Sequence, residues 1–225
     1  MNRFSVSVTI FFIVAVSIMY FAFSENETML SLPADIEFKT AVSDGELKLF
    51  AHANNNEIAM LKSKGNPLPD VGTIVVGSSE ASRMDLAPGT KIKVFGHEME
   101  IEGVLAKTGS ILDSTYLLDS HDFINLNAED KIIVYRDMES VTYFYNYDPQ
   151  DSINLILSEG SMEDYWILNK GNEKYLPALV GSDVKDNNLK LGDVSKYHGE
   201  NIIVKGFLTR TGTPLDYIII IGGKK

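Results

Sequence analysis

The feature that most constrains this chain is an internal duplication. Residues 86–118 match residues 189–221 without a gap, at a constant offset of 103. Ten aligned positions are identical and four of them are glycines. Because glycine marks backbone conformations or close approaches that a Cβ would forbid, equal glycine spacing predicts an equal chain path. The identical pairs are Leu86/Leu189, Gly89/Gly192, Lys93/Lys196, Gly96/Gly199, Gly103/Gly206, Leu105/Leu208, Thr108/Thr211, Gly109/Gly212, Leu112/Leu215 and Asp113/Asp216.

Weaker similarity extends the duplication upstream. Val76-Gly77-Ser78 matches Val180-Gly181-Ser182 at an offset of 104, and residues 58–65 resemble residues 153–160 at an offset of 95. We therefore predict two related units, the first over residues 33–126 and the second over residues 127–225. Two copies are too few for a solenoid. Chance agreement between glycine-rich strands is the competing interpretation.

The N-terminal segment differs from the rest of the chain. Phe4 to Phe23 is 20 residues without a charge, and as a helix it would span roughly 30 Å, the thickness of a bilayer's hydrocarbon core. Arg3 precedes this run while Glu25 and Glu27 follow it, which predicts a cytoplasmic N-terminus. We predict that residues 1–24 form a single transmembrane anchor in the cell membrane, with the C-terminal region extracytoplasmic. The alternative is a signal peptide cleaved after Ser24, which would release a secreted protein.

Composition excludes several classes of protein. The chain has 31 acidic and 20 basic residues, a net charge of −11, and its Lys and Arg residues are not clustered, so we expect no nucleic-acid partner. It has no cysteine, and its four histidines lack metal-ligand spacing, so we expect no metal and no cofactor. Asn26-Glu27-Thr28 is an N-glycosylation sequon, a match that often arises by chance.

Hydrophobic alternation and turn signals predict an α+β fold for each unit, with mostly antiparallel strands and short helices. The Val-Gly-Ser elements are expected to end a strand, with Ser78 and Ser182 capping the short helix that follows. A further short helix is expected from about residue 58 in the first unit and residue 153 in the second. The predicted strands cover residues 35–40, 46–52, 73–76, 91–95, 99–105 and 116–118, then 131–136, 141–147, 176–180, 202–208 and 218–221.

The duplicated motif resembles the periplasmic core domain of MacB/FtsX-type ABC transporter permeases over about 45 residues in each half. The second copy carries it best, and in the first copy Thr90 replaces the motif's Asp. The resemblance implies an extracytoplasmic, non-catalytic domain and not a complete transporter, because the motif occurs twice and no segment after Ile221 would span a bilayer. The resemblance rests on Val180-Gly181-Ser182, Leu191-Gly192-Asp193, Val204-Lys205-Gly206 and Thr211-Gly212, and on Leu112-Asp113-Ser114 and Tyr116-Leu117-Leu118-Asp119 in the first copy.

Two groups of residues are candidates for function. Asp113 and Asp216 are equivalent and follow Thr-Gly turns, so they are expected to fix those loops, although facing carboxylates would also suit a hydrolase. The aromatic residues would form a ligand or partner surface, or would pack between the units. The motif glycines are expected to be structural. The aromatic set is Tyr143, Tyr145, Tyr147, Tyr165 and Trp166; the glycines are Gly77, Gly89, Gly96, Gly103, Gly109, Gly181, Gly192, Gly199, Gly206 and Gly212.

The sequence thus predicts a membrane-anchored, extracytoplasmic, non-catalytic protein. Its expected role is that of an accessory or partner-binding component of a membrane transport system, in contact with a permease or ATPase subunit. A secreted soluble binding protein is the alternative, and a hydrolase that uses the paired aspartates is the third hypothesis.

Overall fold

The computed structural model describes residues 35–43, 45–61, 63–94, 96–136, 141–163, 165, 174–184, 189–197 and 199–222. The predicted membrane helix, the sequon at Asn26 and the aromatic Trp166 lie outside these residues. Within the described ranges, no helix is both long enough and apolar enough to cross a membrane.

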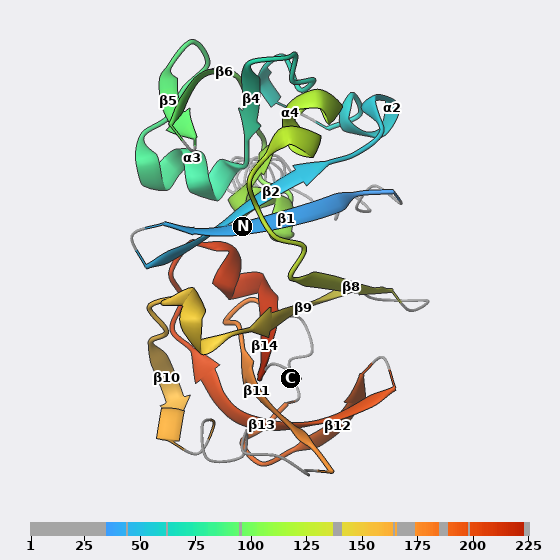
Figure 1. The fold of residues 1–225 in the computed structure, drawn as a ribbon, viewed down its shortest axis with the longest axis vertical. Coiled ribbons are helices and arrows are strands. Elements are labelled where there is room, and N and C mark those ends of the chain that lie inside the picture. The colour runs from blue at the N-terminus through green and yellow to red at the C-terminus, as the bar shows by residue number, and fades with distance from the viewer. Residues whose placement is uncertain are drawn as a thin grey trace, which may run out of the picture.

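The first unit is built on a seven-stranded sheet with the order β1-β2-β7-β4-β6-β3, in which β5 pairs with β6 (Figure 1). Two of its pairings are parallel, β2 with β7 and β4 with β6, and the others are antiparallel. The strands are β1 (Glu37–Ser43), β2 (Glu46–His52), β3 (Ser63–Gly65), β4 (Thr73–Val76), β5 (Lys91–Val94), β6 (His97–Leu105) and β7 (Thr115–Leu117).

The second unit repeats this arrangement strand for strand. Its sheet has the order β8-β9-β14-β11-β13-β10, and β12 pairs with β13. The parallel pairings again fall at equivalent places, β9 with β14 and β11 with β13. The strands are β8 (Ile132–Arg136), β9 (Val141–Tyr147), β10 (Leu157–Gly160), β11 (Leu176–Val180), β12 (Val194–Tyr197), β13 (Glu200–Leu208) and β14 (Ile218–Gly222).

The predicted α+β class with two related sheets is therefore confirmed, and both sheets are mixed. Even an irregularity is repeated, because the register shifts between Ile74 and Val75 on β4 and between Ala178 and Leu179 on β11. The pairing also aligns parts of the units whose sequences have diverged. Leu49 pairs with Thr115 and Tyr143 pairs with Ile218, so β2 and β9 occupy the same place.

The helices are short. Helix α2 (Asn55–Ile58) is a single turn that ends where the predicted helix was expected to begin, and the predicted helix from residue 153 does not form. The short strands β3 and β10 follow these two segments. The predicted role of Ser78 as a cap is wrong, because α3 (Ser78–Met84) begins at that residue with Gly77 at the N-cap. The remaining elements are α4 (Ser120–Asn125) and the 3₁₀ turns η1 (Ile111–Ser114), η2 (Pro149–Asp151) and η3 (Pro214–Tyr217).

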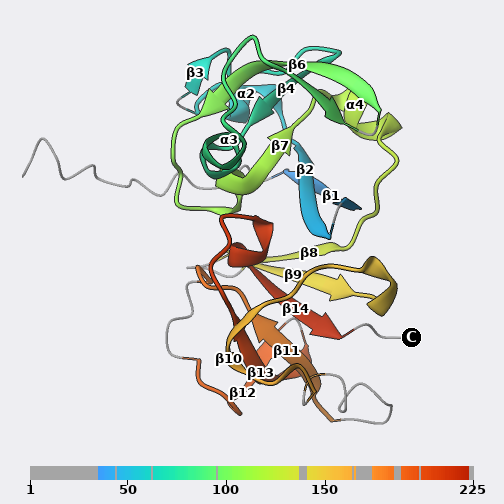
Figure 2. The ribbon, with the colours of Figure 1, turned by 90° about the vertical axis from the view of Figure 1, so that its left-hand side faces the viewer.

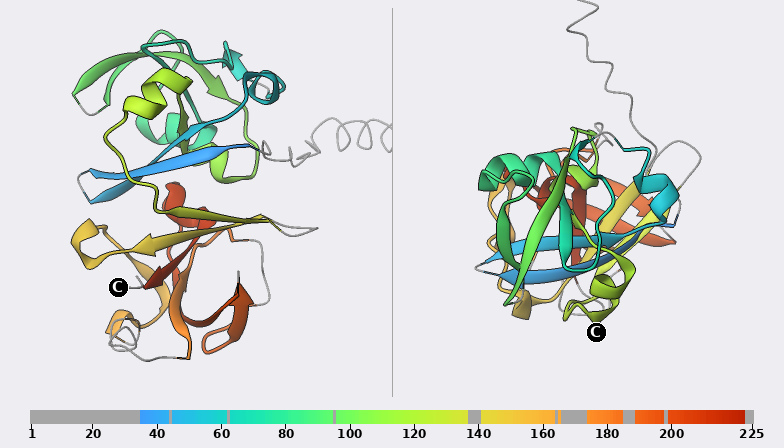
Figure 3. Two further views of the ribbon diagram at one scale, coloured as in Figure 1. Left: turned by 45° about the vertical axis from the view of Figure 1, so that its right-hand side comes forward. Right: turned by 90° about the horizontal axis from the view of Figure 1, so that it is seen from above.

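The two units share one hydrophobic core. The largest buried cluster contains Leu49 and Leu112 of the first unit together with Tyr145 and Ile218 of the second. Smaller clusters lie elsewhere in each unit, around Ile74 in the first and around Val204 in the second. Figures 2 and 3 show the sheets stacked one above the other, with the chain passing from α4 to β8 at one side.

Candidate functional site

The two equivalent aspartates hold the turns that precede η1 and η3. Asp113 accepts hydrogen bonds from the Thr108 backbone N–H at 2.7 Å, from the Thr108 hydroxyl at 2.8 Å and from the Gly109 N–H at 2.9 Å. Asp216 repeats these contacts with Thr211 and Gly212 at 2.8, 3.0 and 2.7 Å. Both side chains are buried. In each unit, both carboxylate oxygens therefore accept hydrogen bonds from the preceding loop, and the aspartate fixes the conformation of that loop.

The motif glycines make matching contacts in the two units. A Cβ on Gly77 would lie 2.0 Å from the carbonyl oxygen of Leu112, and one on Gly181 would lie 2.3 Å from that of Leu215. The strand end thus packs directly on the 3₁₀ turn in both units. The other glycines fall into pairs as well: Gly103 and Gly206 have backbone carbonyls 2.1 and 3.0 Å from a hypothetical Cβ, and positive φ angles recur at Gly89/Gly192, Gly96/Gly199 and Gly109/Gly212.

The four described tyrosines of the predicted aromatic set lie inside the protein. Tyr143, Tyr145, Tyr147 and Tyr165 are buried in the core shared by the two units, so these four side chains do not form an exposed surface. Phe38 of the first unit packs edge-on against Tyr143, with ring centroids 5.8 Å apart. The Tyr145 hydroxyl donates to Asp151 at 2.8 Å. Burial and the contact with Asp151 raise the pKa of Tyr145.

Polar contacts add to this interface. The Asn154 N–H donates to the Gly45 carbonyl at 2.9 Å, at the tip of the first hairpin. The Ser114 hydroxyl donates to the Gly212 carbonyl at 3.2 Å, where η1 meets η3. Thr40 and Glu129 exchange backbone hydrogen bonds of 2.7 and 2.9 Å.

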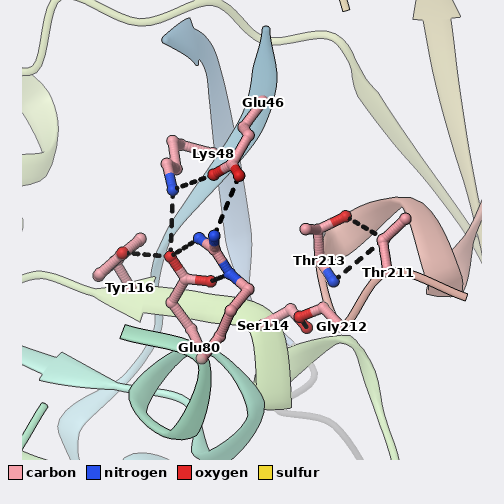
Figure 4. Close-up of polar contacts among 9 residues, drawn as sticks. Glu46, Lys48, Glu80, Ser114, Tyr116, Thr211, Gly212 and Thr213 are labelled. Carbon is pink, nitrogen blue, oxygen red and sulfur yellow. Dashed lines mark hydrogen bonds and ion pairs between the residues drawn. The ribbon is translucent and has the colours of Figure 1, made fainter. Parts of the chain in front are cut away.

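A cluster of charged side chains around one buried carboxylate in the first unit was not predicted from the sequence. Glu80 of α3 is 1% exposed. Both of its carboxylate oxygens accept hydrogen bonds from the Arg83 guanidinium, at 3.0 and 2.7 Å. Lys48 of β2 lies 3.2 Å from the same carboxylate, and the hydroxyl of Tyr116 on β7 donates to it. Glu46 completes the cluster by pairing with Lys48 at 2.9 Å and with Arg83 at 3.0 Å (Figure 4).

The electrostatics of this cluster favour the ionised carboxylate. Burial alone would raise the pKa of Glu80, but the hydrogen bonds from Arg83 and Tyr116 and the charge of Lys48 outweigh it and lower that pKa. The hydrogen bond from Lys48 likewise lowers the pKa of Glu46. Burial, together with the Glu80 charge, raises the pKa of Tyr116. At neutral pH the cluster holds two negative and two positive charges.

The second unit carries no charged residue at the described positions that correspond to Glu80, Tyr116 and Lys48. Glu80 corresponds to Val184 at the offset of 104, and Tyr116 corresponds to Ile219 at the offset of 103. The strand pairing places Thr142 where the first unit has Lys48. Ile219 belongs to an apolar cluster of the second unit, and Val184 packs against that cluster. The charged cluster is therefore a feature of the first unit that the shared fold does not require. From the sequence, only the i, i+3 spacing of Glu80 and Arg83 indicated an interaction.

A second group of polar residues lies around α4. Asp119, His121 and Asp122 place one potential ligand atom each within 4.8 Å of one another. Both carboxylates of this group already have partners. Asp119 caps α4 by accepting a hydrogen bond from the Asp122 N–H at 2.8 Å, and Asp122 accepts one from the Gly72 N–H at 2.6 Å. A groove of about 400 Å³ lies beside them, lined by His52, Ala53, Asn54, Pro69, Asp70, Val71, Asp119 and Ser120.

Comparison with protein-family models, with curated proteins and with solved structures finds no match to this chain.

Proposed function

We propose that this protein is a membrane-anchored, extracytoplasmic, non-catalytic component of a membrane transport system, which acts by binding a permease or ATPase subunit. The uncharged run from Phe4 to Phe23 supports the anchor. The resemblance of the duplicated motif to the periplasmic core domain of MacB/FtsX-type permeases supports the link to transport.

One structural observation carries the non-catalytic part of this proposal. Asp113 and Asp216 are the residues of the motif that would suit acid–base chemistry. In both units, backbone N–H groups of the turn donate hydrogen bonds to both carboxylate oxygens. A carboxylate that acts as a general acid or base needs an oxygen within reach of its substrate. The duplicated motif is thus suited to stabilise the fold of each unit. A fold stabilised in this way supports the binding of a partner subunit.

Affinity purification of the tagged full-length chain from solubilised membranes tests the proposal. We expect a permease or ATPase subunit to be recovered with the chain. Gly181→Val provides a matched control, because its side chain would meet the Leu215 carbonyl and disrupt the second unit, and it should lose the partner. Recovery of no transport subunit, under conditions that preserve known transporter complexes, would contradict the proposal.

Two further measurements separate the alternatives. N-terminal sequencing of the mature chain should find residues 1–24 retained, whereas a chain that begins at Glu25 would be the secreted binding protein. The hydrolase hypothesis requires Asp113→Asn and Asp216→Asn to abolish a hydrolytic activity while the fold persists. We expect these substitutions to act on stability instead.

A further inference from the structure

Helix α3 is attached to the first unit by the polar contacts of Glu80 and by the buried Ala81, which belongs to the core cluster around Ile74. Of its seven residues only Glu80 and Ala81 are buried, and Met84 is 48% exposed. Ala81 buries little apolar area, so it contributes little to holding the helix in place. The polar attachment of α3 to the sheet is the Glu80 carboxylate, which joins the helix to Lys48 on β2 and to Tyr116 on β7.

This attachment depends on the charge of one side chain. Ionised, Glu80 accepts from Arg83, Lys48 and Tyr116 at once. A protonated carboxyl would lose most of its attraction for the two cations, and the cluster would change from a net charge of zero to +1. The half-buried Lys48 and Arg83 would then lose the carboxylate that they share. Among the described residues, the charged and titratable groups that face Glu80 are Arg83 on its own helix and Lys48, Glu46 and Tyr116 on the sheet.

The helix also borders the second unit. Ser79 of α3 lies beside Tyr217 of η3, whose pKa burial raises to about 12. Movement of α3 would thus alter a contact between the units.

We propose that Glu80 is an acid-sensitive latch that holds α3 closed when ionised and releases it from β2 and β7 when protonated. This device goes beyond the proposed function and does not depend on it. Its sign follows from the cluster: because the folded state favours the ionised carboxylate, the latch is closed above the ordinary carboxyl pKa of 4.5 and opens as the pH falls below it. The second unit, which has Val184 and Ile219 at the equivalent positions, lacks the latch.

Hydrogen exchange of the purified full-length chain, followed by mass spectrometry from neutral pH to below pH 4.5 and corrected for the intrinsic rate, tests the latch. Release coupled to one proton predicts that exchange in residues 78–84 rises by up to about tenfold per pH unit as the pH falls from the ordinary carboxyl pKa of 4.5 to the lowered folded pKa, and that it levels off below the folded pKa. Residues 176–180 of β11 should remain protected over the same range. Protection of residues 78–84 that persists until the whole molecule unfolds would overturn the proposal.

Two variants make the test specific to Glu80. Glu80→Gln removes the charge and should leave residues 78–84 in fast exchange already at neutral pH, without a further step on acidification. The triple variant Lys48→Thr, Glu80→Val, Tyr116→Ile installs the residues of the second unit and should show no acid step in this segment. An acid step that survives in either variant would show that another group controls α3.

Discussion

Gly77 shows how a single missing side chain fixes the contact between a strand end and a turn. Its φ of −65° is one that any residue adopts, so the requirement for glycine comes only from the Leu112 carbonyl, 2.0 Å from a hypothetical Cβ. Its neighbour Ser78 offers a contrast, because the Ser78 hydroxyl is buried and has no hydrogen-bond partner among the described residues.

We therefore expect Gly77→Ala to lower the free energy of unfolding by about 3 kcal/mol, since the turn must move to admit the methyl group. Ser78→Ala is the matched control and should change stability by less than about 0.5 kcal/mol, or increase it. Denaturant unfolding of both variants measures the difference. Equal effects of the two substitutions would contradict the close approach.

The effect of Glu80 on stability can be predicted by comparing the first unit with the second unit, whose described residues lack the cluster. Glu80→Ala removes the buried carboxylate that Lys48 and Arg83 share and should cost about 1.5–3 kcal/mol, the usual range for hydrogen bonds to a charged group, because the two cations are part-exposed and keep Glu46 as a partner. The triple variant Lys48→Thr, Glu80→Val, Tyr116→Ile replaces three of the five residues of the cluster by those of the second unit. It should recover most of this loss, because well-packed apolar residues often equal a buried ion pair in stability. A triple variant less stable than Glu80→Ala would contradict this account.

At the scale of elements, the turn before each 3₁₀ helix is the most faithfully repeated part of the molecule. In both units an aspartate binds a threonine hydroxyl and two backbone N–H groups. The hydroxyl of that threonine in turn lies 2.7 Å from the hydroxyl of Ser110 in the first unit or Thr213 in the second. The repetition indicates that the turn belongs to the fold itself.

Asp113→Ala and Asp216→Ala should consequently destabilise the protein to a similar degree, by about 1.5–3 kcal/mol each, the usual range for hydrogen bonds to a charged group. Thermal unfolding of the two variants side by side checks this. A loss confined to one of the two would show that the turns have diverged in role.

The sequence predicted these elements unevenly, for physical reasons. Glu46–His52 and Val141–Tyr147 were placed correctly because their apolar residues are bounded by turns. β3 and β10 were missed because three or four residues such as Ser63-Lys64-Gly65 carry no periodicity. The Glu80 cluster was missed because it joins α3 to two strands through tertiary contacts. Most of the fold could thus be predicted from local pattern, and most of the candidate site could not.

At the scale of the whole molecule, the duplication has produced one body and not two. The core cluster draws buried residues from both units, and backbone hydrogen bonds join Gly45 to Asn154 and Thr40 to Glu129. Domains that share a core unfold together, whereas domains that merely touch unfold separately. Cooperative unfolding of the two units is therefore the central structural claim.

The chain contains a single tryptophan, Trp166, in the second unit, which makes this claim directly measurable. Leu49→Ala in the first unit creates a cavity in the shared core, where Leu49 is fully buried, and should cost about 2–5 kcal/mol. In denaturant titrations of the full-length chain, we predict that circular dichroism and tryptophan fluorescence give one coincident transition, and that Leu49→Ala shifts both by the same amount. A fluorescence transition that stays in place while the circular dichroism transition moves or splits would contradict a single cooperative body.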